Sequence, residues 1–102
     1  MFSDFKMIRL KIQERTSSKE GLRDVLHSLD VDVTESDYFK VRDERSPSCK
    51  LNVDGSCYDY GTGTYYQDAV SLLFDGYKAF NSLPATMQWL CELLNIQQEA
   101  KQ

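Results

Sequence analysis

The sequence predicts an α+β fold in which a small three-stranded antiparallel sheet is flanked by helices. Apolar residues at helical spacing mark segments near both ends of the chain. Between them lie short strand-like segments around an Asp-Gly pair at 54–55, a typical hairpin turn. The chain has 102 residues, of which 41% are hydrophobic, enough for one domain with its own core. We therefore expect a single folded domain.

The charge balance argues against simple DNA binding. Lys and Arg total 12 against 16 Asp and Glu, which leaves a net charge of −4. Sequence-independent affinity for nucleic acid comes mainly from neutralised phosphates, although a local basic face remains possible. No apolar run is long enough for a membrane span, and the N-terminal segment lacks the continuous apolar stretch of a secretion signal. We expect a cytoplasmic protein that does not enter membranes.

The N-terminal segment 2–13 is compatible with two structures. Phe5, Ile8 and Ile12 lie at helical spacing, whereas Ile8, Leu10 and Ile12 alternate as in a strand. A helix is the favoured prediction.

A second helix is predicted over residues 18–29. Ser17 precedes Glu20 by three residues, the spacing of a capping box, in which each side chain accepts a bond from the other's free backbone N–H. Four apolar residues then follow at helical spacing: Leu22, Val25, Leu26 and Leu29.

The strands are expected in the middle of the chain. Residues 38–41 form one short strand, and residues 48–53 and 56–60 form a hairpin with a two-residue turn at Asp54-Gly55. The Gly-Thr-Gly segment at 61–63 is expected to end the last strand before a helix.

Two more helices are predicted after the sheet. One begins near Gln67, with an apolar face of Val70, Leu73, Phe74 and Tyr77. The last begins at Ser82-Leu83-Pro84, with the proline in its first turn, and buries Met87, Leu90 and Leu94. Residues 97–102 form a polar tail.

The middle of the chain resembles the N-terminal zinc-ribbon domain of DnaG-type DNA primases. Arg-Asp-Glu-Arg-Ser-Pro-Ser at 42–48, the hairpin, Tyr-Asp-Tyr-Gly-Thr-Gly at 58–63 and Gln-Asp-Ala-Val at 67–70 follow that family's order and spacing. The resemblance also includes Leu83–Leu90 and covers residues 18–96, so residues 1–17 are interpreted as an N-terminal extension. Metal-free relatives from phages and mobile elements have a similar turn in place of the cysteine knuckle.

The family's four zinc ligands are missing. Their positions are occupied by Phe39, Arg42, Asp59 and Thr62, and one carboxylate with one hydroxyl cannot form a tetrahedral zinc site. The sequence therefore predicts a metal-free domain with no cofactor. We expect Asp59 to accept backbone N–H bonds within its turn.

The resemblance implies binding of a single-stranded DNA template by the sheet. The candidate residues pair cations for phosphate contacts with rings for base stacking: Lys40, Arg42, Arg45, Lys50, Tyr58 and Tyr60. The corresponding function is a non-catalytic nucleic-acid-binding or docking module of a primase-like DNA replication protein, of phage or mobile-element type, with single-stranded DNA or a replication protein as partner. The alternative is a small acidic protein–protein interaction module or inhibitor that has lost DNA binding, which the net charge favours. A solvated strand face explains the same residues without any ligand.

The remaining reactive residues indicate no enzyme activity. Cys49, Cys57 and Cys91 form no Cys-x-x-Cys pair and are interpreted as reduced structural thiols. His27, the only histidine, has no companion cysteine or second histidine nearby and is expected at the surface. The carboxylates at 30–37 lack a base or metal motif, so any primase activity would belong to another domain.

Overall fold

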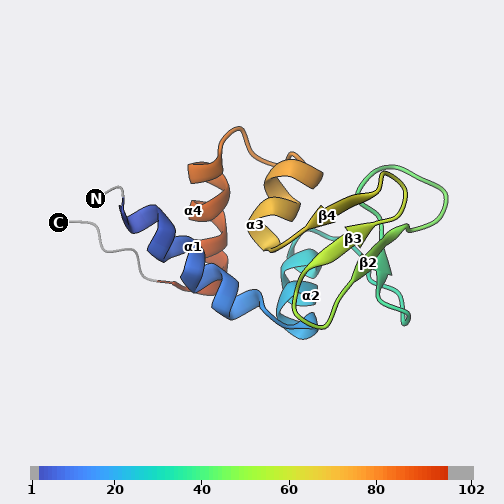
Figure 1. Ribbon diagram of the computed structural model, residues 1–102, viewed down its shortest axis with the longest axis horizontal. Helices are drawn as coiled ribbons and strands as arrows, with labels where there is room; N and C mark the ends of the chain where they lie inside the picture. The colour runs from blue at the N-terminus through green and yellow to red at the C-terminus, as the bar shows by residue number, and fades with distance from the viewer. Residues whose placement is uncertain (1–2, 97–102) are drawn as a thin grey trace.

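The computed structural model describes residues 3–96. Its helices are α1 (Ser3–Thr16), α2 (Lys19–Ser28), α3 (Ala69–Ser71), the π-helical turn η1 (Leu72–Gly76) and α4 (Leu83–Leu94). Its strands are β1 (Tyr38–Phe39), β2 (Cys49–Leu51), β3 (Cys57–Asp59) and β4 (Thr64–Tyr66). Helices α1 and α4 lie at one end of the molecule and the sheet lies at the other (Figure 1). The α+β class is confirmed.

The sheet has four antiparallel strands in the order β1-β2-β3-β4, so the prediction of three was wrong by one. The extra strand is β4. Gly63 adopts a φ of 73° and donates its N–H to the Asp59 carbonyl at 2.7 Å, so the chain reverses tightly there. Thr64 then pairs with Asp59. The Gly-Thr-Gly segment therefore forms a hairpin turn and does not end the sheet.

The hairpin between β2 and β3 has a longer turn than predicted. The Asn52 N–H donates to the Ser56 carbonyl at 2.8 Å, and the Gly55 N–H donates to the Asn52 carbonyl at 3.1 Å. Residues 53–55 therefore form a three-residue loop, with Gly55 in the left-handed region at φ 85°. Asp54 accepts bonds from the Ser56 N–H and hydroxyl, which fixes the turn.

The two N-terminal helices match their predicted type. Residues 3–16 form a helix with Ile12 fully buried, which resolves the choice between helix and strand. Helix α2 begins one residue later than the capping-box pattern indicated, because Ser18, and not Ser17, accepts the Gly21 N–H at 3.0 Å. The Ser17 hydroxyl instead donates to the Glu14 carbonyl at the end of α1.

The last helix lies where it was expected, whereas the helix predicted near Gln67 is short: α3 continues as the π-helical turn η1, which buries Leu72 in place of the expected Phe74. Asp68 is the N-cap of α3 and accepts the Ser71 N–H at 2.8 Å. Ser82 caps α4, with Pro84 in the first turn. Helix α4 ends at Asn95, which has a left-handed φ of 59°.

One core joins the helices to the inner face of the sheet. Ile12 of α1 belongs to the same buried cluster as Phe39 of the sheet and Leu90 of α4. The segment expected as an N-terminal extension therefore packs into the core. The proposed polar tail, 97–102, lies outside the described residues. Within residues 3–96, no helix combines the length and apolar character that a membrane crossing requires.

Candidate nucleic-acid interface

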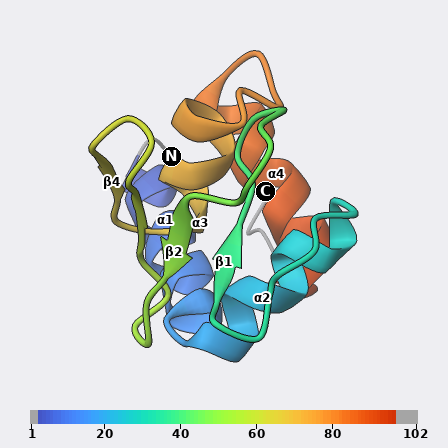
Figure 2. The same ribbon diagram turned by 90° about the vertical axis from the view of Figure 1, so that its right-hand side faces the viewer.

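The outer face of the sheet carries a row of aromatic residues. Along each strand, alternate side chains point to opposite faces, and Cys49, Leu51, Cys57 and Asp59 are buried on the helix side. The strand register places four outward residues side by side across the whole sheet: Tyr38, Lys50, Tyr58 and Tyr65. Figure 2 shows β1 and β2 in front of α1 and α3, with α2 beside β1.

A fourth tyrosine joins this row. Tyr60 follows β3, and its ring centroid lies 4.7 Å from that of Tyr58 in an edge-to-face arrangement and 6.5 Å from that of Tyr38. The Lys50 Nζ lies 5.0 Å from the Tyr38 ring centroid, within range of a cation–π contact. We call the set Tyr38, Lys50, Tyr58, Tyr60 and Tyr65 the tyrosine face.

The outermost rings of the tyrosine face are available to a ligand. Tyr60 is 65% exposed and Tyr65 is 57% exposed. Large aromatic side chains exposed together on one sheet are typical of a contact surface. The tyrosine face is therefore the strongest candidate for binding among the described residues.

Of the six predicted binding residues, the structure brings Lys50, Tyr58 and Tyr60 together on the tyrosine face. Arg45 is exposed in the loop between β1 and β2. Lys40 is also exposed, but it lines a hollow with Asp30 and Asp32, whose carboxylates offset its charge.

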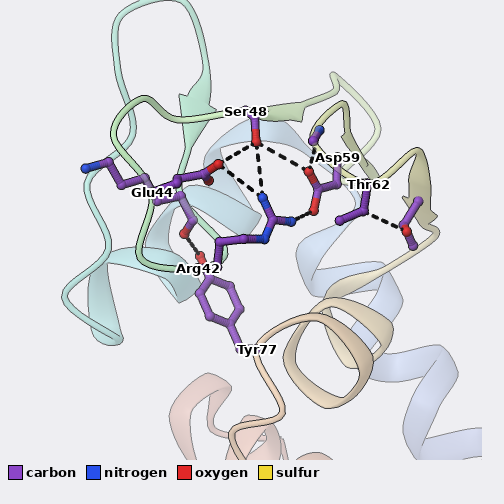
Figure 3. Close-up of polar contacts among 9 residues, drawn as sticks. Arg42, Glu44, Ser48, Asp59, Thr62 and Tyr77 are labelled. Carbon is purple, nitrogen blue, oxygen red and sulfur yellow. Dashed lines mark hydrogen bonds and ion pairs between the residues drawn. The ribbon is translucent and has the colours of Figure 1, made fainter.

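Arg42, the sixth candidate, is held in an ion-pair network. Its guanidinium donates to the carboxylate of Asp59, which is fully buried, and to Glu44 Oε1 at 3.1 Å. The Ser48 hydroxyl donates to the same Glu44 oxygen at 2.9 Å (Figure 3). Because Asp59 faces the helix side of the sheet, Arg42 has a structural role here and does not lie on the tyrosine face.

The network joins the β1–β2 loop to the turn that follows β3. Arg42 comes from the β1–β2 loop, and Asp59 ends β3 at the following turn. Asp59 also accepts the Gly61 N–H at 2.9 Å, as predicted from its place in the turn. Arg42 and Asp59 thus connect these loops through charge-assisted hydrogen bonds.

The other two positions compared with zinc ligands do not take part. Phe39 is fully buried in the core, and the exposed Thr62 shares a hydrogen bond of 2.9 Å with the Thr64 hydroxyl. Within the described range 3–96, no group of three or more His, Cys, Asp or Glu side chains is arranged to hold a metal ion.

The cysteines lie in the core, and His27 is exposed as predicted. Cys49 and Cys57 are fully buried on neighbouring strands. A hydrogen bond with Cys49, together with burial, raises the pKa of Cys57 well above its ordinary value. A thiol that stays protonated is a poor nucleophile and metal ligand, which fits the structural interpretation.

Two members of the tyrosine face, Tyr38 and Tyr65, were not among the predicted binding residues. Tyr38 was placed on a strand without a binding role, and Tyr65 was not assigned to a strand because β4 was not predicted. The sequence signal for β4 is its composition, because Thr64, Tyr65 and Tyr66, directly after Gly63, are all residue types that favour strands.

Comparison with known proteins assigns no family or function to the chain. No protein-family model matches the chain, and neither a characterised protein nor a solved structure is significantly similar to it. The functional interpretation therefore rests on the geometry of the tyrosine face.

Proposed function

We propose that the tyrosine face binds single-stranded nucleic acid, and that the protein acts as a non-catalytic binding module. The observation that carries the proposal is the row of tyrosine rings around Lys50 on the outer face of the sheet, of which Tyr60 and Tyr65 are largely exposed. Unpaired bases stack on aromatic side chains whatever their sequence, and each stacked base contributes roughly 1–3 kcal/mol. The resemblance to primase zinc-ribbon domains supports single-stranded DNA as the ligand and a primase-like replication protein as the context.

The charges imply that base stacking contributes more to the binding free energy than phosphate contacts do. Lys50 lies within the tyrosine face and Arg45 lies in the β1–β2 loop, whereas Arg42 forms an ion pair with Asp59. Each phosphate contact on a single strand adds about 0.7 to the slope of log affinity against log salt. Two contacts therefore predict a slope of only about 1.4.

Titration of a labelled oligodeoxythymidine tests the proposal. Because Tyr60 and Tyr65 are largely exposed, Tyr60→Ala and Tyr65→Ala should leave the fold intact and weaken binding roughly 5- to 150-fold each. Lys50→Gln should lower the salt slope by about 0.7. Leu93→Ala, an exposed apolar residue on α4, is the control and should bind as the wild type does.

The alternative is a protein-binding role for the same surface. Tyrosine is enriched in protein interfaces, and the net charge of −4 disfavours nucleic acid. Absence of oligonucleotide binding by the folded wild type at low salt would reject the first proposal and favour this one. Equal binding by wild type and both tyrosine variants would show that any DNA contact lies elsewhere.

A further inference from the structure

A second exposed apolar surface lies on α1, at the opposite end of the molecule from the sheet (Figure 1). Ile8 and Ile12 pack toward the core, yet the same helix exposes Phe5 and Leu10, each more than 40% accessible. Leu83, at the start of α4, is also exposed. Large apolar side chains gathered on one surface indicate an interaction site, whereas isolated ones do not.

This surface contains two neighbouring hollows. One, of about 260 Å³, lies between α1 and the start of α4 and is lined by Phe5, Leu83, Pro84 and Met87. The other, of about 320 Å³, is lined by Leu10, Gln13 and Gln67. Lys6 and Arg9 line both hollows, and because Arg9 is paired with Asp68, the positive charge that a partner meets there is that of Lys6.

The charge of α1 contrasts with that of the whole chain. The helix has four basic residues, Lys6, Arg9, Lys11 and Arg15, against Asp4 and Glu14, a net charge of +2 in a chain of net −4. Arg9 is paired with Asp68 at 3.1 Å, whereas Lys6 and Lys11 are exposed on the outer side of α1. A negatively charged partner would therefore be attracted to α1.

We propose that the α1 surface, composed of the two hollows with Phe5, Lys6, Leu10 and Leu83, docks an acidic peptide segment of a partner protein. An apolar side chain of that segment fills the hollow between Phe5 and Leu83, and its carboxylates pair with Lys6. A second copy of this chain fits less well, because it would present the same net positive helix to this surface. The site is separate from the tyrosine face and does not depend on nucleic-acid binding.

Fluorescence anisotropy with a labelled model peptide tests this proposal. The probe consists of glutamates with phenylalanine and leucine at helical spacing, and its matched control replaces every glutamate with lysine. The glutamate peptide should bind and the lysine peptide should not. Phe5→Ser and Lys6→Glu should each weaken binding about fivefold or more, whereas Val53→Ser in the distant β2–β3 turn should change nothing.

Melting temperatures and NMR spectra distinguish loss of binding from loss of folding. Because Phe5 and Lys6 are exposed, both variants should have the melting temperature of the wild type. In the NMR spectrum of the wild type, the peptide should shift the amide signals of α1 and of the start of α4. Shifts on the sheet, equal binding of both peptides, or no binding of the glutamate peptide would overturn the proposal. Sedimentation equilibrium showing a wild-type dimer that Phe5→Ser dissociates would overturn it in favour of a second copy.

Discussion

Asp59→Asn should destabilise the protein strongly, because it removes the charge that holds Arg42. Asp59 is fully buried and accepts bonds from Arg42 and from the Gly61 N–H. The asparagine retains one carbonyl oxygen for Gly61, but its amide group is a donor facing a guanidinium that also only donates. A hydrogen bond to a charged group contributes roughly 1.5–3 kcal/mol, so the expected loss is about 2–3 kcal/mol in the free energy of unfolding. For a domain of this size, that lowers the melting temperature by about 10 °C or more.

Urea denaturation followed by Trp89 fluorescence and circular dichroism measures this loss. Asp43→Asn is the matched control, since Asp43 is exposed in the loop next to Arg42, and it should change stability by less than about 0.5 kcal/mol. Combining Asp59→Asn with Arg42→Met should cost less than the sum of the single variants, because one interaction is removed twice. Stability of Asp59→Asn equal to that of the control, or strict additivity, would refute a stabilising role for the network.

Three further predictions concern pH, metal and thiols. Burial raises the pKa of Asp68, but bonds from Arg9, the Ser71 N–H and Gln13 outweigh it and lower the pKa below its ordinary 3.8. The stability gained from Asp68 is therefore present above about pH 4 and lost as the pH falls through the lowered pKa, and urea midpoints measured across that range should fall less steeply for Asp68→Asn. A chelator should leave the melting temperature unchanged, and elemental analysis finding stoichiometric zinc would contradict this. Cys49, Cys57 and Cys91 should be reduced, so a non-reducing mass measurement two hydrogens light would contradict that interpretation.

The helices were predictable from the sequence because their signals are local. Helix α2 shows its apolar positions at helical spacing, and Ser82 with Pro84 marks the start of α4. The predicted start of α2 was one residue too early because either of two adjacent serines could cap the helix. The backbone conformation shows that Ser18 is the N-cap.

The fourth strand and the network were less accessible to sequence reasoning. Strand β4 has three residues, too few for a clear alternation, and its place in the sheet depends on the left-handed turn at Gly63. The bond between Arg42 and Asp59 joins residues 17 positions apart, and no local pattern indicates which carboxylate an arginine will contact. Arg42 was therefore interpreted as a phosphate contact, although Asp59 was correctly expected to organise its own turn.

Strand alternation separates stability from binding in this sheet. Asp59 points to the helix side and anchors Arg42, whereas its neighbours Tyr58 and Tyr60 point outward. A substitution at 59 is therefore expected to act on folding, and a substitution at 60 on ligand binding. The ion-pair network and the tyrosine face lie on opposite sides of the same strand, so a substitution that weakens one need not alter the other.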